Sequence, residues 1–129
     1  MKVVALKIYK NQDKLLRILV ESGLYSSLSE CLRTAIWDFL KIEWQQDGSS
    51  LIIEKEYPEE HVKDFKSATV SITGKFPLSM IASVDTIVNT SKKYKNRSEF
   101  FRAALVYFLV ADSKLFFPFI LENKQVPVL

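Results

Sequence analysis

Four cationic side chains crowd into the segment around the start of a predicted helix, at Lys92, Lys93, Lys95 and Arg97. Clustered ammonium and guanidinium groups can neutralise phosphate oxygens, and the free backbone amides at a helix N-terminus also bind anions. The same cluster is equally typical of a solvated loop. The sequence alone leaves both interpretations open.

Charge is distributed unevenly along the 129 residues, although the overall net charge of +3 is too small to indicate a nucleic-acid partner by itself. Residues 1–42 carry +3, residues 43–66 carry −4, residues 67–112 carry +3 and the remainder carries +1. Two basic segments therefore flank an acidic one. Such segments can serve phosphate binding, but alone they are more often solvated helix faces.

Side chains that could perform catalysis or bind a metal are few. His61 stands beside Glu59, Glu60 and Asp64, but no second histidine or cysteine is close enough in sequence to complete a metal site. Cys31 is the single cysteine, and it fits a small packing residue better than a nucleophile. The chain has neither a glycine-rich phosphate loop nor a Ser/His/Asp set. We therefore expect no enzymatic activity, no metal and no cofactor.

The elements that must position the basic groups occur twice. Residues 29–40 align without gaps on residues 98–109, at an offset of 69, and both segments read S-E-x-Φ-R-x-A-Φ-x-x-F-L, where Φ is a large apolar residue. Apolar residues recur in each at i, i+3, i+4, i+7 and i+8, which predicts an amphipathic helix. Because the same pattern appears in the same order, the chain contains an internal repeat.

Each of these predicted helices opens with a capping signal. Ser27 and Asn96 can accept hydrogen bonds from the first free backbone amides. Phosphate binding would use the same geometry as capping. Capping is nevertheless the favoured role of four residues just inside the helices: Ser29, Glu30, Ser98 and Glu99.

A shorter helical pattern precedes each capped helix. Asn11 or Asp13 is expected to cap the first, and Gly23 is expected to end it. Pro77 suits the beginning of the second.

Further upstream, large apolar residues recur at every second position, at Val4, Leu6 and Ile8 and again at Val70, Ile72 and Phe76, and this period of two predicts two half-buried strands. Gly74 either weakens the second strand or allows another backbone to approach closely. One strand is not stable alone, so we expect the two to pair in a ribbon packed on helices. The expected fold is therefore mainly α with a small β ribbon, in the α+β class.

Four segments follow from this pattern. Residues 1–42 form the first copy of the unit, residues 43–67 an acidic linker, residues 68–112 the second copy and residues 113–129 an apolar C-terminal tail. No apolar run reaches the roughly 20 residues that a bilayer-spanning helix needs, so we expect no membrane partner.

A strand, a helix, a turn and a helix that opens S-x-S-E or N-x-S-E resemble the ribbon-helix-helix superfamily of MetJ, Arc and CopG type. Its members are usually homodimers of one-unit chains. The tandem arrangement resembles that of some regulators of crenarchaeal viruses and implies an intramolecular pseudo-dimer. The resemblance implies a transcription regulator that binds double-stranded DNA with its ribbon in the major groove. The single cysteine excludes an internal disulfide, so we expect a cytoplasmic location, in the host cell if the protein is viral.

The resemblance assigns base reading to the outward side chains of the ribbon. Of these, Val3 and Ala5 offer only apolar contact, for instance to a thymine methyl group, whereas the other four can form hydrogen bonds. We therefore expect a lopsided reader, dominated by the second copy, that prefers an asymmetric site or depends on DNA shape. The six base-reading candidates are Val3, Ala5, Lys7, Ser71, Thr73 and Lys75.

The resemblance assigns phosphate binding to the beginning of each capped helix, where the backbone amides and the helix dipole favour anions. Arg33 and Arg102 are expected to tie helices together rather than to contact bases. The basic loop makes the second copy the stronger expected anchor. The phosphate-binding candidates are Ser27, Leu28, Ser29, Lys92, Lys93, Lys95, Asn96, Arg97 and Ser98.

Two further segments leave alternatives open. The acidic linker suggests a surface turned away from DNA. The tail, with residues 115–121 and 126–129 mostly apolar, either folds back onto the last helix or mediates self-association with a neighbouring molecule. Two other functions remain: an antitoxin whose tail wraps a toxin, and a protein-interaction module that keeps the fold with little or no DNA reading.

Overall fold

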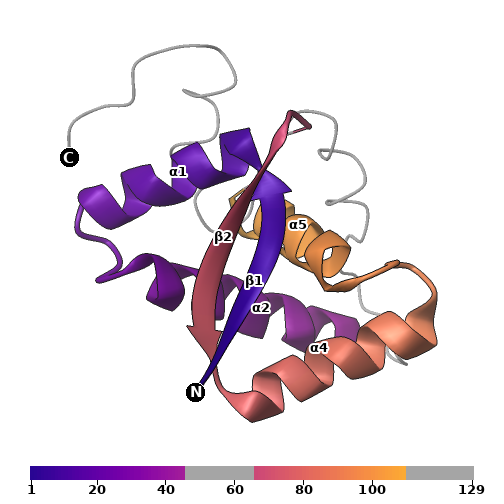
Figure 1. Ribbon diagram of the computed structural model, residues 1–129. Coiled ribbons are helices and arrows are strands. Elements are labelled where there is room, and N and C mark those ends of the chain that lie inside the picture. Colours follow the sequence, from indigo (N-terminus) through magenta and orange to yellow (C-terminus); the bar gives the residue numbers. More distant parts are fainter. Residues whose placement is uncertain (46–65, 110–129) are drawn as a thin grey trace.

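The computed structural model describes residues 1–45 and 66–109 of the chain. Within these residues the protein is mixed α+β, with one two-stranded antiparallel ribbon and four helices (Figure 1). This confirms the expected fold class at that level. The elements are β1 (Lys2–Tyr9), α1 (Lys10–Glu21), α2 (Leu28–Gln45), β2 (Thr69–Phe76), α4 (Leu78–Ser91) and α5 (Arg97–Tyr107).

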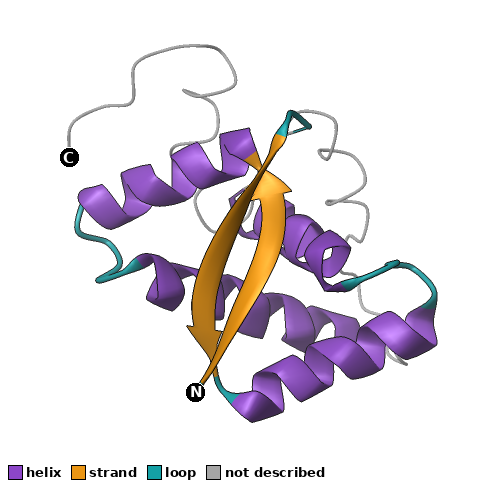
Figure 2. Ribbon diagram, in the orientation of Figure 1, coloured by secondary structure: helices purple, strands orange, loops and turns teal. Residues whose placement is uncertain are grey.

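The ribbon lies across one side of the helices, and Figure 2 shows both strands in front of them. β1 and β2 pair so that Leu6 stands opposite Ile72 and Val4 opposite Gly74. The alternation expected from the sequence is confirmed, because every second residue is buried against the helices and its neighbours are exposed. The buried side of the ribbon consists of Val4, Leu6, Ile8, Ile72, Gly74 and Phe76.

Gly74 is required by side chains rather than by a neighbouring backbone. A Cβ atom at this position would lie 3.0 Å from Leu32 Cδ1 and 3.0 Å from Phe76 Cε2. Leu32 and the ring of Phe76 therefore fill the space that a side chain would need. The expectation of a close backbone approach is replaced by close side-chain packing.

The repeated stripe of apolar residues forms the centre of the core. Leu32, Ala35 and Ile36 of α2 are fully buried, and their counterparts in α5, offset by 69, are buried in the same way. Edge-to-face aromatic pairs join the two copies, with Tyr25 and Phe108 5.9 Å apart and Phe39 and Tyr94 6.4 Å apart between ring centroids. Under the offset of 69, Tyr25 corresponds to Tyr94 and Phe39 corresponds to Phe108. The same two positions of each copy therefore form the aromatic contacts with the other copy.

The first helix of each copy begins differently from the sequence prediction. Asn11 and Asp13 lie inside α1, whose N-cap residue is Tyr9. The amide of Tyr9 donates to the Gln12 side chain at 3.1 Å, so a glutamine in the first turn supplies the capping interaction. In the second copy Pro77 is the N-cap of α4 rather than its first helical residue.

The ends of these helices correspond. Gly23 has φ +90° after α1, as expected, and Lys92 has φ +61° after α4. The two positions are related by the offset of 69, so the second copy places a lysine in a left-handed conformation that favours glycine.

Most of the acidic linker and the apolar C-terminal tail expected from the sequence lie outside the described residues. Helix α2 continues to Gln45, beyond residue 42. Of the helices within residues 1–45 and 66–109, none has both the length and the apolarity to cross a bilayer.

Cys31 should be unreactive in the folded protein. It is fully buried, and burial raises the pKa of its thiol to about 12, which lowers the thiolate fraction at pH 8 about a thousandfold relative to the ordinary value of 9.0. We expect negligible labelling by a thiol reagent in native buffer and rapid stoichiometric labelling in denaturant. Rapid native labelling would contradict the buried position.

Candidate nucleic-acid interface

The six base-reading candidates all lie on the exposed side of the ribbon, which we call the ribbon face. Each row across the face contains one residue from each strand. All six side chains are exposed, and Val3 is 60% exposed despite being apolar. The rows pair Val3 with Lys75, Ala5 with Thr73 and Lys7 with Ser71.

Helix α5 holds the backbone of Lys7 at two points. The Lys7 amide donates to Ser98 Oγ at 3.0 Å, and Arg102 Nη1 donates to the Lys7 carbonyl oxygen at 2.9 Å. In an antiparallel pair, alternate residues turn these groups away from the partner strand. Ser98 and Arg102, one helical turn apart, therefore bond the amide and the carbonyl oxygen that Lys7 presents on the outer edge of β1.

Helix α2 makes the same contacts with the other edge. The Lys75 amide donates to Ser29 Oγ at 3.1 Å, and Arg33 Nη1 donates to the Lys75 carbonyl oxygen at 2.9 Å. Each helix thus holds the strand of the other copy. Arg33 and Arg102 are structural, as expected, but each ties a helix to a strand rather than to another helix. The attribution of Ser29 and Ser98 to capping is wrong, because both hydroxyls accept from a strand amide.

Capping falls to the residues around these serines, as expected. Ser27 Oγ accepts from the Glu30 amide at 3.1 Å, and Asn96 Oδ1 accepts from the Glu99 amide at 2.9 Å. Glu30 Oε1 in turn accepts from the amide of Ser26 at 2.6 Å and from the Ser26 hydroxyl at 2.7 Å, and these two bonds to Ser26 hold the pKa of Glu30 below its usual value. The amides of the first two residues in each helix have no intrahelical partner and point out of the helix end.

The basic loop is less available for anions than the sequence suggests. Arg97 forms two hydrogen bonds with Asp85 of α4, at 2.7 and 2.9 Å. Lys93 Nζ lies 3.3 Å from Glu43 Oε1. Two of the four cations are therefore already paired with carboxylates. This weakens the expectation that the second copy is the stronger phosphate anchor. Lys92 and Lys95 are exposed, and neither forms an ion pair within the part of the chain that the structure describes.

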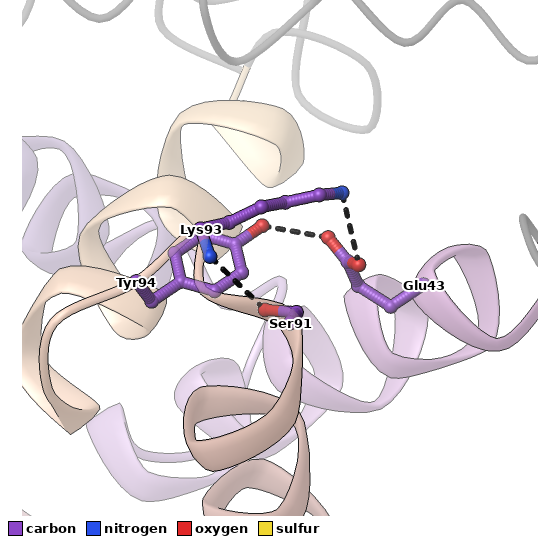
Figure 3. A network of polar contacts seen from close by, with 4 residues as sticks. All are labelled: Glu43, Ser91, Lys93 and Tyr94. Atoms are coloured by element: carbon purple, nitrogen blue, oxygen red, sulfur yellow. Dashed lines mark hydrogen bonds and ion pairs between the residues drawn. The ribbon is translucent and has the colours of Figure 1, made fainter.

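Glu43 connects the end of α2 to this loop (Figure 3). Its Oε2 accepts a 2.6 Å hydrogen bond from the Tyr94 hydroxyl, and the amide of Lys93 donates to Ser91 Oγ at 3.2 Å. The glutamate side chain is only 8% exposed. This contact is not predictable from local sequence, because Glu43 belongs to the acidic segment and its partners are about 50 residues away.

The role of the two serine–arginine pairs was also missed. The signal was present, because S-x-x-x-R places both side chains on the same side of a helix and recurs in both copies. Its meaning depends on which strand lies beside the helix. That information is not local to the motif.

Within residues 1–45 and 66–109, no three His, Cys, Asp or Glu side chains gather where they could hold a metal ion. His61 lies outside these ranges. No protein-family model, curated protein or solved structure matches this chain.

Replacing Arg102 should destabilise the protein more than replacing an ordinary surface arginine. Arg102→Ala removes the hydrogen bond to the Lys7 carbonyl and the stacking of the guanidinium on Tyr9, 5.4 Å from the ring centroid. We expect a loss of about 1–2 kcal/mol in urea unfolding. The control is Arg17→Ala, which removes only an exposed pair with Asp13 and should cost about 0.5 kcal/mol or less. Equal losses would contradict the role of Arg102.

The Asp85–Arg97 pair should make a pH-dependent contribution to stability. Hydrogen bonds from Arg97 hold the pKa of Asp85 below its usual value of 3.8. Because the pKa is lower in the folded state, this stability is present above about pH 4 and is lost as the pH falls through the folded value. Asp85→Asn should therefore be less stable at pH 7, and the difference from the wild type should narrow below pH 4. Arg97→Gln should show the same convergence in denaturant unfolding; a pH-independent difference for both would be inconsistent with the pair.

Proposed function

We propose that this chain is a sequence-specific transcription regulator of the ribbon-helix-helix superfamily that binds double-stranded DNA. The observation that carries the proposal is the ribbon face, where six exposed side chains from two strands include Lys7 and Lys75. The major groove is about 12 Å wide and admits a two-stranded ribbon. Lysine donates to guanine O6 and N7, while serine and threonine hydrogen-bond to several base edges.

The proposed regulator is an intramolecular pseudo-dimer. Its support is the reciprocity of the contacts between copies: α2 holds β2, α5 holds β1, and the Tyr25–Phe108 contact has a counterpart at Phe39–Tyr94. The central row pairs Ala5 with Thr73, which lie two residues before Lys7 and Lys75, so these positions are equivalent in the strands, where the offset is 68. An antiparallel pair that joins equivalent residues is what an approximate twofold axis through the ribbon requires.

Phosphate contacts are proposed for the N-termini of α2 and α5. Ser29 and Ser98 tie these ends to the two edges of the ribbon, so their free amides flank the ribbon face on both sides. A ribbon inserted in the groove would bring one helix end toward the backbone of each DNA strand. Exposed Lys92 and Lys95 would add charge on one side.

A second candidate is a protein-interaction module that keeps the fold with little or no DNA reading. Val3 and Ala5 favour it, since they place apolar surface where a base reader would be polar. An antitoxin remains an alternative within DNA binding, and the tail on which it depends lies outside the described residues.

Binding to duplex DNA should weaken steeply with salt. If about six phosphates are contacted, the slope of log affinity against log salt concentration should be near −5, because each contact releases condensed counterions. Fluorescence anisotropy with a labelled random-sequence duplex, followed by a selected duplex, measures this slope. An interaction module would show a slope near zero or no binding.

Two lysine variants separate base contacts from phosphate contacts. Lys75→Ala should relax the preference among duplexes of different sequence. Lys95→Ala, a matched exposed lysine away from the ribbon, should weaken all duplexes alike and reduce the salt slope by about one. If both variants behaved identically, the assignment of base reading to the ribbon face would be wrong.

A further inference from the structure

Because the two strands are antiparallel, each end of the ribbon face combines one residue from each copy. Lys7 lies beside Ser71 at one end, and Lys75 lies beside Val3 at the other. We call these pairs the Lys7 row and the Lys75 row. Each row therefore contains one lysine, although the second copy alone holds three of the four polar residues of the face.

The two lysines are held in matching ways. Both are exposed, and the amide and the carbonyl oxygen of each are fixed by a serine and an arginine at distances within 0.1 Å of each other: 3.0 and 2.9 Å for Lys7, 3.1 and 2.9 Å for Lys75. They stand on opposite strands, diagonally across the Ala5–Thr73 pair. The side chains of Lys7 and Lys75 therefore project from equivalent backbone positions.

The rows are four residues apart along the ribbon. At about 3.3 Å per residue this separation is roughly 13 Å, which is close to four base-pair steps of about 3.4 Å. An approximate twofold axis between the rows would bring the lysines to opposite DNA strands. The two lysines can therefore recognise the same base on the two strands of one site.

The rows differ at one position. Ser71 has a hydroxyl that donates and accepts, while Val3 is apolar and 60% exposed. An exposed valine in the major groove can contact the methyl group of thymine, which is the one apolar group on the base edges there. Serine at the matching position has no such preference.

We propose, resting on the function proposed above, that the ligand is an imperfect inverted repeat in duplex DNA. Each half contains a guanine contacted by one lysine, on opposite strands and about four base pairs apart. The half facing the Lys75 row also contains a thymine beside Val3, and the other half does not require one. This differs from the one-sided reader expected from the sequence, because the register gives each half a lysine.

Selection from a random duplex library with the full chain tests the proposal directly. The expected consensus has paired guanines on opposite strands and one thymine that is preferred in a single half. A consensus confined to one half would overturn the inference while leaving DNA binding intact. Absence of any duplex binding would instead remove the proposed function on which the inference rests.

Lys7→Ala and Lys75→Ala form a matched pair for the guanines. Each should reduce the preference for guanine by roughly 5- to 100-fold in its own half and leave the other half unchanged. Both side chains are exposed, so circular dichroism and thermal melting should match the wild type. If only Lys75→Ala changed the preference, the one-sided reader would be correct.

Replacing the thymine by deoxyuridine removes only its methyl group. In the selected duplex this should weaken wild-type binding about fourfold, the value of one buried methylene-sized group. Val3→Ser should abolish that loss and shift the selected consensus toward a perfect palindrome. Ser71→Val is the reciprocal variant and should create a thymine preference in the other half. A methyl effect that persists in Val3→Ser would overturn the role of Val3.

Discussion

A two-stranded ribbon has two open edges, and the satisfaction of these edges determines how this protein is arranged. Alternate residues of each strand direct their N–H and C=O groups away from the partner strand, where they would attract other chains. At Lys7 and Lys75 a serine and an arginine from a helix of the other copy bond both groups. The positions of helix and strand are therefore determined together. The same bonds fix where the lysine side chains leave the ribbon.

The sequence predicted what depends on local periodicity. The stripe that begins at Leu32 and the alternation along the strands are repeated patterns, and both identify the buried side correctly. It did not predict the partners of Ser98 or Glu43, since these lie some 50 to 90 residues away. It did not predict the start of α1 either, because Gln12, inside the helix, supplies the capping interaction expected from Asn11 or Asp13. DNA binding itself comes from a resemblance and stays a prediction.

Matched positions in the two copies use different chemistry to stabilise the same arrangement. In the second copy Arg97 of α5 pairs with Asp85 of α4. The residue of the first copy that corresponds to Arg97 is Leu28, which is partly buried against the core and forms no ion pair. A surface ion pair contributes less than apolar burial of this extent. The second copy therefore joins α4 and α5 by a surface ion pair, whereas the first copy places apolar packing at the position of Arg97.

Both strands of the ribbon belong to a single chain, and this has a kinetic and evolutionary consequence. Where such a ribbon forms between two separate polypeptides, the folded fraction falls on dilution, because assembly is second order. Here pairing of β1 with β2 is first order and independent of protein concentration. A single molecule per cell would fold as completely as a thousand. Each strand always meets one particular partner, so a substitution at Val3 is never duplicated at Ser71, and the halves are free to diverge.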